Sequence, residues 1–233
     1  SVHRWGREAR RALEAARAQV AALVGAAPGE IVFTSGGTEA NQLALRGLAG
    51  RRRLVSALEH DSVRQAAAGA AVIPATPQGV VDLAALERML AQDARPALVS
   101  LMLANNETGA IQPVAEAARL AHAKGALLHC DAIQAAGKIA IDCAALGADL
   151  LSLSAHKLGG PQGVGALVVA GAVPLAALQT GGGQERGRRA GTENLPGIVG
   201  FAAAAAAAAR LDDHAAVAAL RDEAERRLAA IAP

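Results

Sequence analysis

Short apolar runs of strand length alternate with helical segments along most of this 233-residue chain. The first strand is expected over Ile31–Thr34, and others over residues 54–58, 71–73, 97–103, 126–130 and 150–153. Between them, apolar residues recur at helical spacing, for example in residues 7–24. Strands that are apolar throughout are buried on both faces. The pattern therefore predicts an α/β fold with a mainly parallel central sheet flanked by helices.

Turn and capping residues mark the ends of several of these elements. Asp82 is suited to cap a helix over residues 83–90, and a helix that starts at Pro113 is expected to stop at Gly125. For a further strand over residues 164–169 either direction is open, and the tight glycine turn before it favours an antiparallel one. After Thr192 the sequence is expected to be helical, first through an alanine run and then over residues 212–230.

Composition argues against several classes of function. Lys and Arg total 23 against 21 Asp and Glu, a formal net charge of +2, so neither nucleic acid nor an anionic membrane is an expected partner. We interpret the arginine cluster at residues 51–53 as a solvated loop. Cys130 and Cys143 form no metal-ligand pattern and no disulfide framework, which favours a reducing cytoplasm. The longest apolar run, residues 201–209, is too short to cross a bilayer.

Polar side chains of unlike chemistry follow the predicted strands. Five strand ends carry them, at Thr38, His60, Asn106, Asp131 and Lys157. In an open parallel sheet, ligands bind outside the carboxyl ends of the strands. We therefore expect these five side chains to line one pocket.

Two of these residues point to a particular chemistry. Lys157 lies between an apolar strand and a glycine-rich turn, where an activated amine would form a Schiff base with a carbonyl or with pyridoxal phosphate. Taken alone, such a lysine is more often a solvated loop residue. Asp131 ends a buried strand, where an unpaired carboxylate is costly. It needs a cationic partner, such as a protonated pyridine nitrogen, unless it caps the following helix.

The turn Gly36-Gly37-Thr38 lies between a strand and a helix. Its main-chain donors and its hydroxyl suit a phosphate. It lacks the lysine of a P-loop and the third glycine of a dinucleotide fingerprint, so an ordinary tight turn is an equal alternative. A metal site at residues 129–131 is not expected, because consecutive residues of a strand point to opposite faces.

Six segments, in order along nearly the whole chain, resemble fold-type I pyridoxal-phosphate enzymes of aminotransferase class V, and more narrowly the cysteine desulfurases of the NifS/IscS group. They cover residues 31–41, 59–60, 105–109, 129–134, 152–161 and 181–194. Asp131-Ala-Ile-Gln134 and Ser154-Ala-His-Lys157 carry the resemblance to class V. The stretch Gly187-Arg-Arg-Ala-Gly-Thr192 favours a desulfurase.

The resemblance implies roles around the ring of the cofactor, pyridoxal 5'-phosphate. Lys157 would bind the cofactor covalently and later move the α-proton of the substrate. His60 would stack on the pyridine ring and serve as acid or base. Asp131 would hold the ring nitrogen, Gln134 would bond the phenolic oxygen, and Asn106 would lie beside the ring and the substrate carboxylate.

The resemblance also implies how the phosphate is held and how the chain assembles. Gly37, Thr38, Ser154 and His156 would bind the phosphate of the same subunit. Thr192 would reach the phosphate of the partner subunit, which makes a homodimer the expected unit.

The implied activity is that of a cytoplasmic cysteine desulfurase. It would convert L-cysteine to L-alanine and pass the sulfur as an enzyme persulfide to a sulfur-acceptor or iron-sulfur scaffold protein, for iron-sulfur cluster or thio-cofactor assembly. The chain begins with Ser1, and neither of its cysteines matches the persulfide cysteine of the family. We therefore expect a fragment: a large cofactor-binding domain over residues 1–200, and helices over residues 201–233 that lead to a largely missing C-terminal domain. The alternatives are a selenocysteine lyase or aminotransferase of class V, or a truncated module without catalysis.

Overall fold

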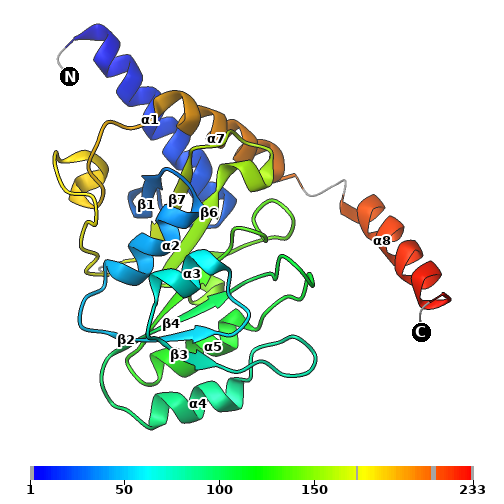
Figure 1. Ribbon diagram of the computed structural model, residues 1–233. Helices are drawn as coiled ribbons and strands as arrows, with labels where there is room; N and C mark the ends of the chain where they lie inside the picture. Colours follow the sequence, from blue (N-terminus) through cyan, green and yellow to red (C-terminus); the bar gives the residue numbers. More distant parts are fainter. Residues whose placement is uncertain (1–2, 172, 211–213, 232–233) are drawn as a thin grey trace.

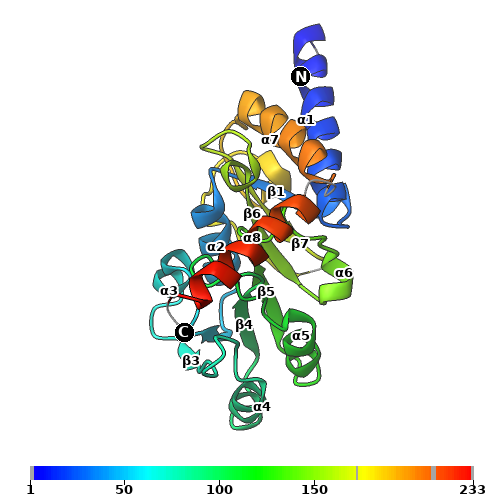
Figure 2. The same ribbon diagram turned by 90° about the vertical axis from the view of Figure 1, so that its right-hand side faces the viewer.

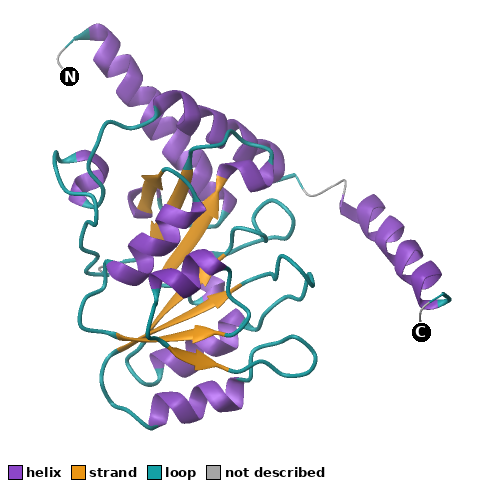
Figure 3. Cartoon of the chain, in the orientation of Figure 1, coloured by secondary structure: helices purple, strands orange, loops and turns teal. Residues whose placement is uncertain are grey.

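A seven-stranded sheet forms the centre of the molecule in the computed structural model, which describes residues 3–171, 173–210 and 214–231 (Figures 1 and 3). The strands are β1 (Ile31–Thr34), β2 (Arg52–Ser56), β3 (Ala71–Ile73), β4 (Ala97–Met102), β5 (Leu127–Asp131), β6 (Leu150–Ser154) and β7 (Gly165–Val169). The helices are α1 (Arg4–Leu23), α2 (Gly37–Arg46), α3 (Asp61–Ala66), α4 (Leu83–Ala91), α5 (Val114–His122), α6 (Cys143–Leu146), α7 (Leu195–Ala208) and α8 (His214–Ala229). Short 3₁₀ turns are η1 (Pro28–Glu30), η2 (Ala155–Leu158) and η3 (Gln184–Gly187).

The strands lie in the order β1-β7-β6-β5-β4-β2-β3. Neighbours from β6 to β3 pair in parallel, whereas β7 pairs antiparallel with both β6 and β1. The reversal follows from the short glycine-containing turn between β6 and β7, since a parallel pair needs a much longer crossover. The predicted α/β class, the mainly parallel sheet and the antiparallel last strand are all confirmed.

Different helices cover the two faces of the sheet (Figures 1 and 2). Successive residues of a strand alternate between the faces. Leu151 and Leu153 of β6 pack in a core cluster with α1, α4, α5 and α7, whereas Leu150 packs in a second cluster with α2 and α3. Both faces are thus apolar, which is why the strands read as continuous apolar runs.

The arginines at residues 51–53 differ from the prediction. β2 begins at Arg52, two residues before the predicted start, so the cluster is not a solvated loop. The Arg52 guanidinium donates to the carbonyls of Met89 and Leu90 in the last turn of α4, and to that of Asp93 just after it. Arg53 Nε likewise donates to Leu45 O near the end of α2. These arginines satisfy helix carbonyls that have no partner within their own helices.

A buried ion pair covers the free edge of β1. Two hydrogen bonds of 2.7 and 2.8 Å join Arg17 of α1 to Glu185 of η3, and both residues are buried. Arg17 Nη1 also donates to Ile31 O, and the N–H of Phe33 donates to Glu185 Oε2. The pair therefore satisfies main-chain groups of the edge strand that would otherwise be open to a foreign strand.

The C-terminal region contains two helices in different surroundings. α7 crosses the predicted boundary at residue 200, lies beside α1 in Figure 2 and buries Ile198 and Phe201 in the sheet core. α8 lies apart from the sheet in Figure 1, and its Val217 and Leu220 are exposed. The predicted start of this helix at residues 212–213 lies outside the described residues. We find no helix in the described part of the chain with the length and apolar character to span a bilayer.

Candidate active site

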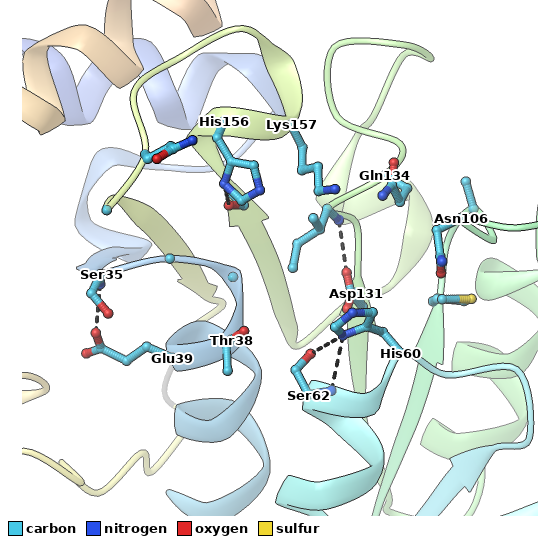
Figure 4. A pocket seen from close by; sticks show the side chains of 18 residues that line it. Ser35, Thr38, Glu39, His60, Ser62, Asn106, Asp131, Gln134, His156 and Lys157 are labelled. Atoms are coloured by element: carbon cyan, nitrogen blue, oxygen red, sulfur yellow. Dashed lines mark hydrogen bonds between the residues drawn. The ribbon is translucent and has the colours of Figure 1, made fainter.

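A cavity of about 550 Å³ opens at the carboxyl ends of the parallel strands (Figure 4). All the predicted site residues except Thr192 line it, namely Gly37, Thr38, His60, Asn106, Asp131, Gln134, Ser154, His156 and Lys157. They follow β1, β2, β4, β5 and β6, so the five strand ends that carry unlike polar groups do meet in one pocket.

One side of the cavity is the tight turn between β1 and α2. Gly36 has a φ of 157°, and an added Cβ there would meet no atom within 4 Å in the described chain, so the space beside its main chain is open. At Gly37 an added Cβ would lie 2.2 Å from Ile133 Cδ1, so glycine allows α2 to approach the turn after β5 closely. The N–H groups of the first helical turn and the nearby Ser154 and His156, whose Oγ and Nδ1 are 3.0 Å apart, suit an anion.

Glu39 lies at the same end of α2 and is paired with Arg189. Arg189 Nε donates to Glu39 Oε1 at 2.9 Å, and the N–H of Ser35 donates to Oε2 at 2.7 Å. Burial alone would raise the pKa of Glu39, but these hydrogen bonds together bring it below its ordinary value. Arg189 thus compensates the negative charge beside the turn and ties residues 181–194 to it.

On the floor of the cavity, a chain of hydrogen bonds runs from Asp131 to His60. Asn41 of α2 donates one amide hydrogen to Asp131 Oδ2 at 2.8 Å and the other to Ser62 Oγ at 2.9 Å. Ser62 Oγ lies 2.8 Å from His60 Nδ1. Burial raises the pKa of Asp131, although hydrogen bonds from the N–H of Ile133 and from Asn41 oppose the rise. A cation in the cavity would stabilise the ionised carboxylate.

The same contacts fix the tautomer of His60. This residue caps α3, and the N–H of Ser62 donates to its Nδ1 at 3.1 Å. Because Nδ1 accepts that hydrogen bond, neutral His60 carries its proton on Nε2. Nε2 is then the ring nitrogen that is left to exchange a proton with a ligand.

Lys157 lies in η2, the single turn that follows β6, and its amine extends into the cavity between His156 and Gln134 in Figure 4. Asn106 also lines the cavity, and its amide donates a hydrogen bond to Glu107 Oε1. Thr192 is the exception among the predicted residues. It is exposed and lines a separate hollow of about 110 Å³ together with Arg189 and Asn194.

Comparison with known protein families matches residues 1–232 to "Aminotransferase class-V". The chain belongs to the aminotransferase class-V family.

Several proteins that are similar to this chain are named cysteine desulfurases. The chain is 48% identical to the cysteine desulfurase of Cereibacter sphaeroides, over 100% of this chain and 63% of that protein. It is 45% identical to the cysteine desulfurase IscS of Anaeromyxobacter sp. (strain Fw109-5), over 97% and 57% of the two chains. The chain thus spans about three fifths of the curated relatives that it matches.

Solved structures give the same result. A NifS-like protein from Rickettsia africae ESF-5 superposes with a TM-score of 0.92 at 37% identity, covering 98% of this chain and 66% of that one. SspA, solved in complex with cysteine, superposes with a TM-score of 0.81 at 35% identity, covering 88% and 63%. The resemblance to NifS/IscS-like cysteine desulfurases is confirmed.

Three further residues of this class-V site had no role predicted from the sequence: Asn41, Ser62 and Glu59. Asn41 follows Thr38 by three residues, which places both on one face of α2, and this spacing could have predicted that Asn41 lies at the site. Ser62 follows His60 by two residues, as expected of a residue that pairs with a helix cap. No spacing in the sequence indicated that Glu59 is buried.

Glu59 is a buried acid beside Asp131, with 5% of its surface exposed. In the described part of the chain no side chain donates a hydrogen bond to its carboxyl group, and only the main chain of Met102 opposes the rise in its pKa. Burial, and then the charge of Asp131, raise the pKa of Glu59 well above its ordinary value. Glu59 therefore favours the neutral, protonated form in the folded chain.

We expect Glu59→Gln to raise the melting temperature at neutral pH and to leave it nearly unchanged near pH 4. Above the ordinary pKa of a glutamate, the unfolded chain loses this proton while the folded chain retains it, so the parent loses stability as pH rises. Glutamine has no such proton to lose. Thermal unfolding between pH 4 and 8 measures the difference, with the exposed Glu87→Gln as control. A difference that does not grow with pH would mean that Glu59 is ionised in the folded protein.

Proposed function

We propose that this chain is the cofactor-binding part of a cysteine desulfurase that uses pyridoxal phosphate. One observation carries the proposal: the amine of Lys157, the buried carboxylate of Asp131 and the glycine turn before α2 face one cavity from three sides. An aldehyde, a pyridine nitrogen and a phosphate are the three groups of pyridoxal phosphate that such residues bind.

The residues present fit this cofactor. The open space beside Gly36 and the N-terminus of α2 would receive the phosphate, together with Thr38, Ser154 and His156. Asp131, whose burial is costly without a cation, would hold the protonated ring nitrogen. Gln134 would bond the phenolic oxygen. When bound, the ring withdraws electrons from the substrate's α-carbon.

The chain's own residues would move the protons. Lys157 Nζ would take the α-proton of the substrate and would return a proton later. His60 would stack on the ring and carry an exchangeable proton at Nε2, while Ser62 holds its Nδ1. Asn41 would keep Asp131 in place through the 2.8 Å hydrogen bond to Oδ2. Asn106 would lie beside the substrate carboxylate.

The names of the relatives support L-cysteine as the substrate and sulfur as the transferred group. The proposed product is L-alanine, with the sulfur held as a persulfide on a cysteine other than Cys130 or Cys143. Burial raises the pKa of both of these thiols, Cys143 to about 11, and therefore disfavours the reactive thiolate. The exposed Thr192 supports a homodimer in which it reaches the partner's phosphate. We also propose that the sulfur passes to a sulfur-acceptor or iron-sulfur scaffold protein, and that the protein is cytoplasmic.

The proposal predicts that the purified chain retains pyridoxal phosphate through gel filtration and shows the absorption band of lysine-bound cofactor. Added L-cysteine should then release alanine, with a small thiol as sulfur acceptor. Pyridoxal, which lacks the phosphate, is the matched control and should be retained far less. A retained band without alanine release would support the cofactor site but not the proposed reaction of L-cysteine in this chain. Loss of the cofactor on the column would favour a module without catalysis.

A further inference from the structure

A second lysine joins the two segments that carry Lys157 and Gln134. The ammonium of Lys138 donates to Gln134 O at 2.9 Å and to Lys157 O at 3.2 Å. Lys138 lies at the end of the turn that follows β5, whereas Lys157 lies in η2 after β6. One side chain thus bridges the main chains of two neighbouring strand ends that line the cavity.

Both carbonyl groups lack a partner in regular structure. η2 is a single turn, and the last carbonyls of a helix have no intrahelical donor. Hydrogen bonds from an ammonium are stronger than neutral ones. Lys138 is exposed over much of its side chain, but partial desolvation of its amine, and then the charge of Lys157, lower its pKa, which is consistent with an amine held close to Lys157.

The preceding residue brings these segments together. Gly137 has a φ of 73°, and an added Cβ would lie 2.9 Å from Ala208 Cβ of α7 and 3.1 Å from Leu158 Cβ of η2. The turn therefore lies directly against η2 and the end of α7. Glycine permits this contact, and the next residue, Lys138, then donates two hydrogen bonds that join the turn to η2.

We propose that Lys138 is a positioning residue that fixes the main chain of Lys157 relative to that of Gln134. This inference rests on the proposed function, in which Lys157 binds the cofactor and Gln134 bonds its ring oxygen. A bridge between their carbonyls keeps the amine and the amide at a constant separation across the ring. Lys138 itself does not need to contact the cofactor.

The first test is amide hydrogen exchange in the cofactor-free chain. Lys138→Met removes both donors and keeps the apolar stem, whereas Lys138→Arg keeps a cationic donor. We expect the amides of residues 132–139 and 155–160 to exchange about tenfold faster in the Met variant and close to the parent rate in the Arg variant. The exposed Lys124→Met, at the end of α5, is the matched control. Unchanged exchange in the Met variant would overturn the bridge.

The second test follows the amine of Lys157. The chain has three lysines, Lys124, Lys138 and Lys157. Borohydride trapping with pyridoxal phosphate and peptide mapping therefore give the labelling rate at each. Labelling of Lys157 should fall about tenfold to a hundredfold in Lys138→Met, because small displacements of a reacting group are costly, and should recover in Lys138→Arg. If Lys157 labelling fell equally in Lys138→Met and Lys138→Arg while amide exchange stayed at the parent rate, the loss would not come from the missing hydrogen bonds to the carbonyls. That result would overturn the positioning role.

The two tests separate this inference from the proposed function. If the parent is not labelled at Lys157, the proposed function fails, while hydrogen exchange still decides whether Lys138 bridges the segments. If Lys138→Met does not fold, Lys138→Gln replaces it, because an amide on a shorter stem cannot reach both carbonyls. It should show the same faster exchange in both segments.

Discussion

Replacing Lys157 with alanine is expected to abolish covalent retention of pyridoxal phosphate and all release of alanine from L-cysteine. Lys157 is the lysine whose amine lines the cavity in the described structure. Its removal takes away both the covalent attachment and the base for the α-proton. Loss of the positioned base alone costs about 10²- to 10⁴-fold in rate. Activity should therefore fall below detection.

No other lysine is placed to replace it. The amine of Lys138 is engaged with two carbonyls, and Lys124 is exposed at the end of α5. The measurement is the visible spectrum of each variant after removal of free cofactor, with Lys124→Ala as the matched control. A parent-like band in Lys157→Ala would mean that the cofactor binds elsewhere, and the proposed site would be wrong. Loss of the band in Lys124→Ala as well would indicate a general loss of folding.

The position of most site residues could be predicted because it depends on the sheet alone. Asp131 and Lys157 directly follow apolar runs, and the ends of parallel strands meet at one edge whatever the side-chain details. The strands themselves were predictable because burial on both faces requires unbroken apolar segments. The predicted start of a strand was wrong where charged residues were read as a loop. β2 begins at Arg52, because carbonyl groups of α4 accept hydrogen bonds from its guanidinium there.

The contacts that the sequence did not reveal depend on how separate elements lie on the sheet. Asn41 hydrogen-bonds Asp131, 90 residues away in sequence, only because α2 packs on the sheet with the face that carries Asn41 toward the end of β5. Glu59 is buried near Asp131 and the main chain of Met102, at the ends of two other strands, and no local sequence pattern indicates this. The pairing of Arg17 with Glu185 spans 168 residues, and both look like ordinary surface charges in the sequence.

The Arg17–Glu185 pair gives the largest expected effect on stability. Each side chain is about 95% buried, and Arg17 also lies over the ring of Phe33, with Cζ 4.8 Å from the ring centroid. Removing one partner of a buried ion pair leaves the other charge uncompensated, at a cost of about 3–5 kcal/mol. We therefore expect Arg17→Ala to lower the free energy of unfolding by that amount. For a chain of this size, the melting temperature should fall by roughly 6–20 °C.

The double variant Arg17→Met/Glu185→Leu distinguishes charge from edge protection. It removes both charges, so it lacks the uncompensated charge that Arg17→Ala leaves on Glu185. It also leaves Ile31 O and the N–H of Phe33 without their partners, at about 1–3 kcal/mol for each buried group, so its free energy of unfolding should remain below that of the parent.

Denaturant unfolding measures the free energy of unfolding of each variant. Arg4→Ala, which breaks an exposed ion pair with Glu8 on the same helix, is the control and should cost no more than about 1 kcal/mol. If the double variant matched the parent, the pair would contribute nothing to the edge of β1. If Arg17→Ala lost no more than the control, the buried pair would not hold residues 181–194 against α1.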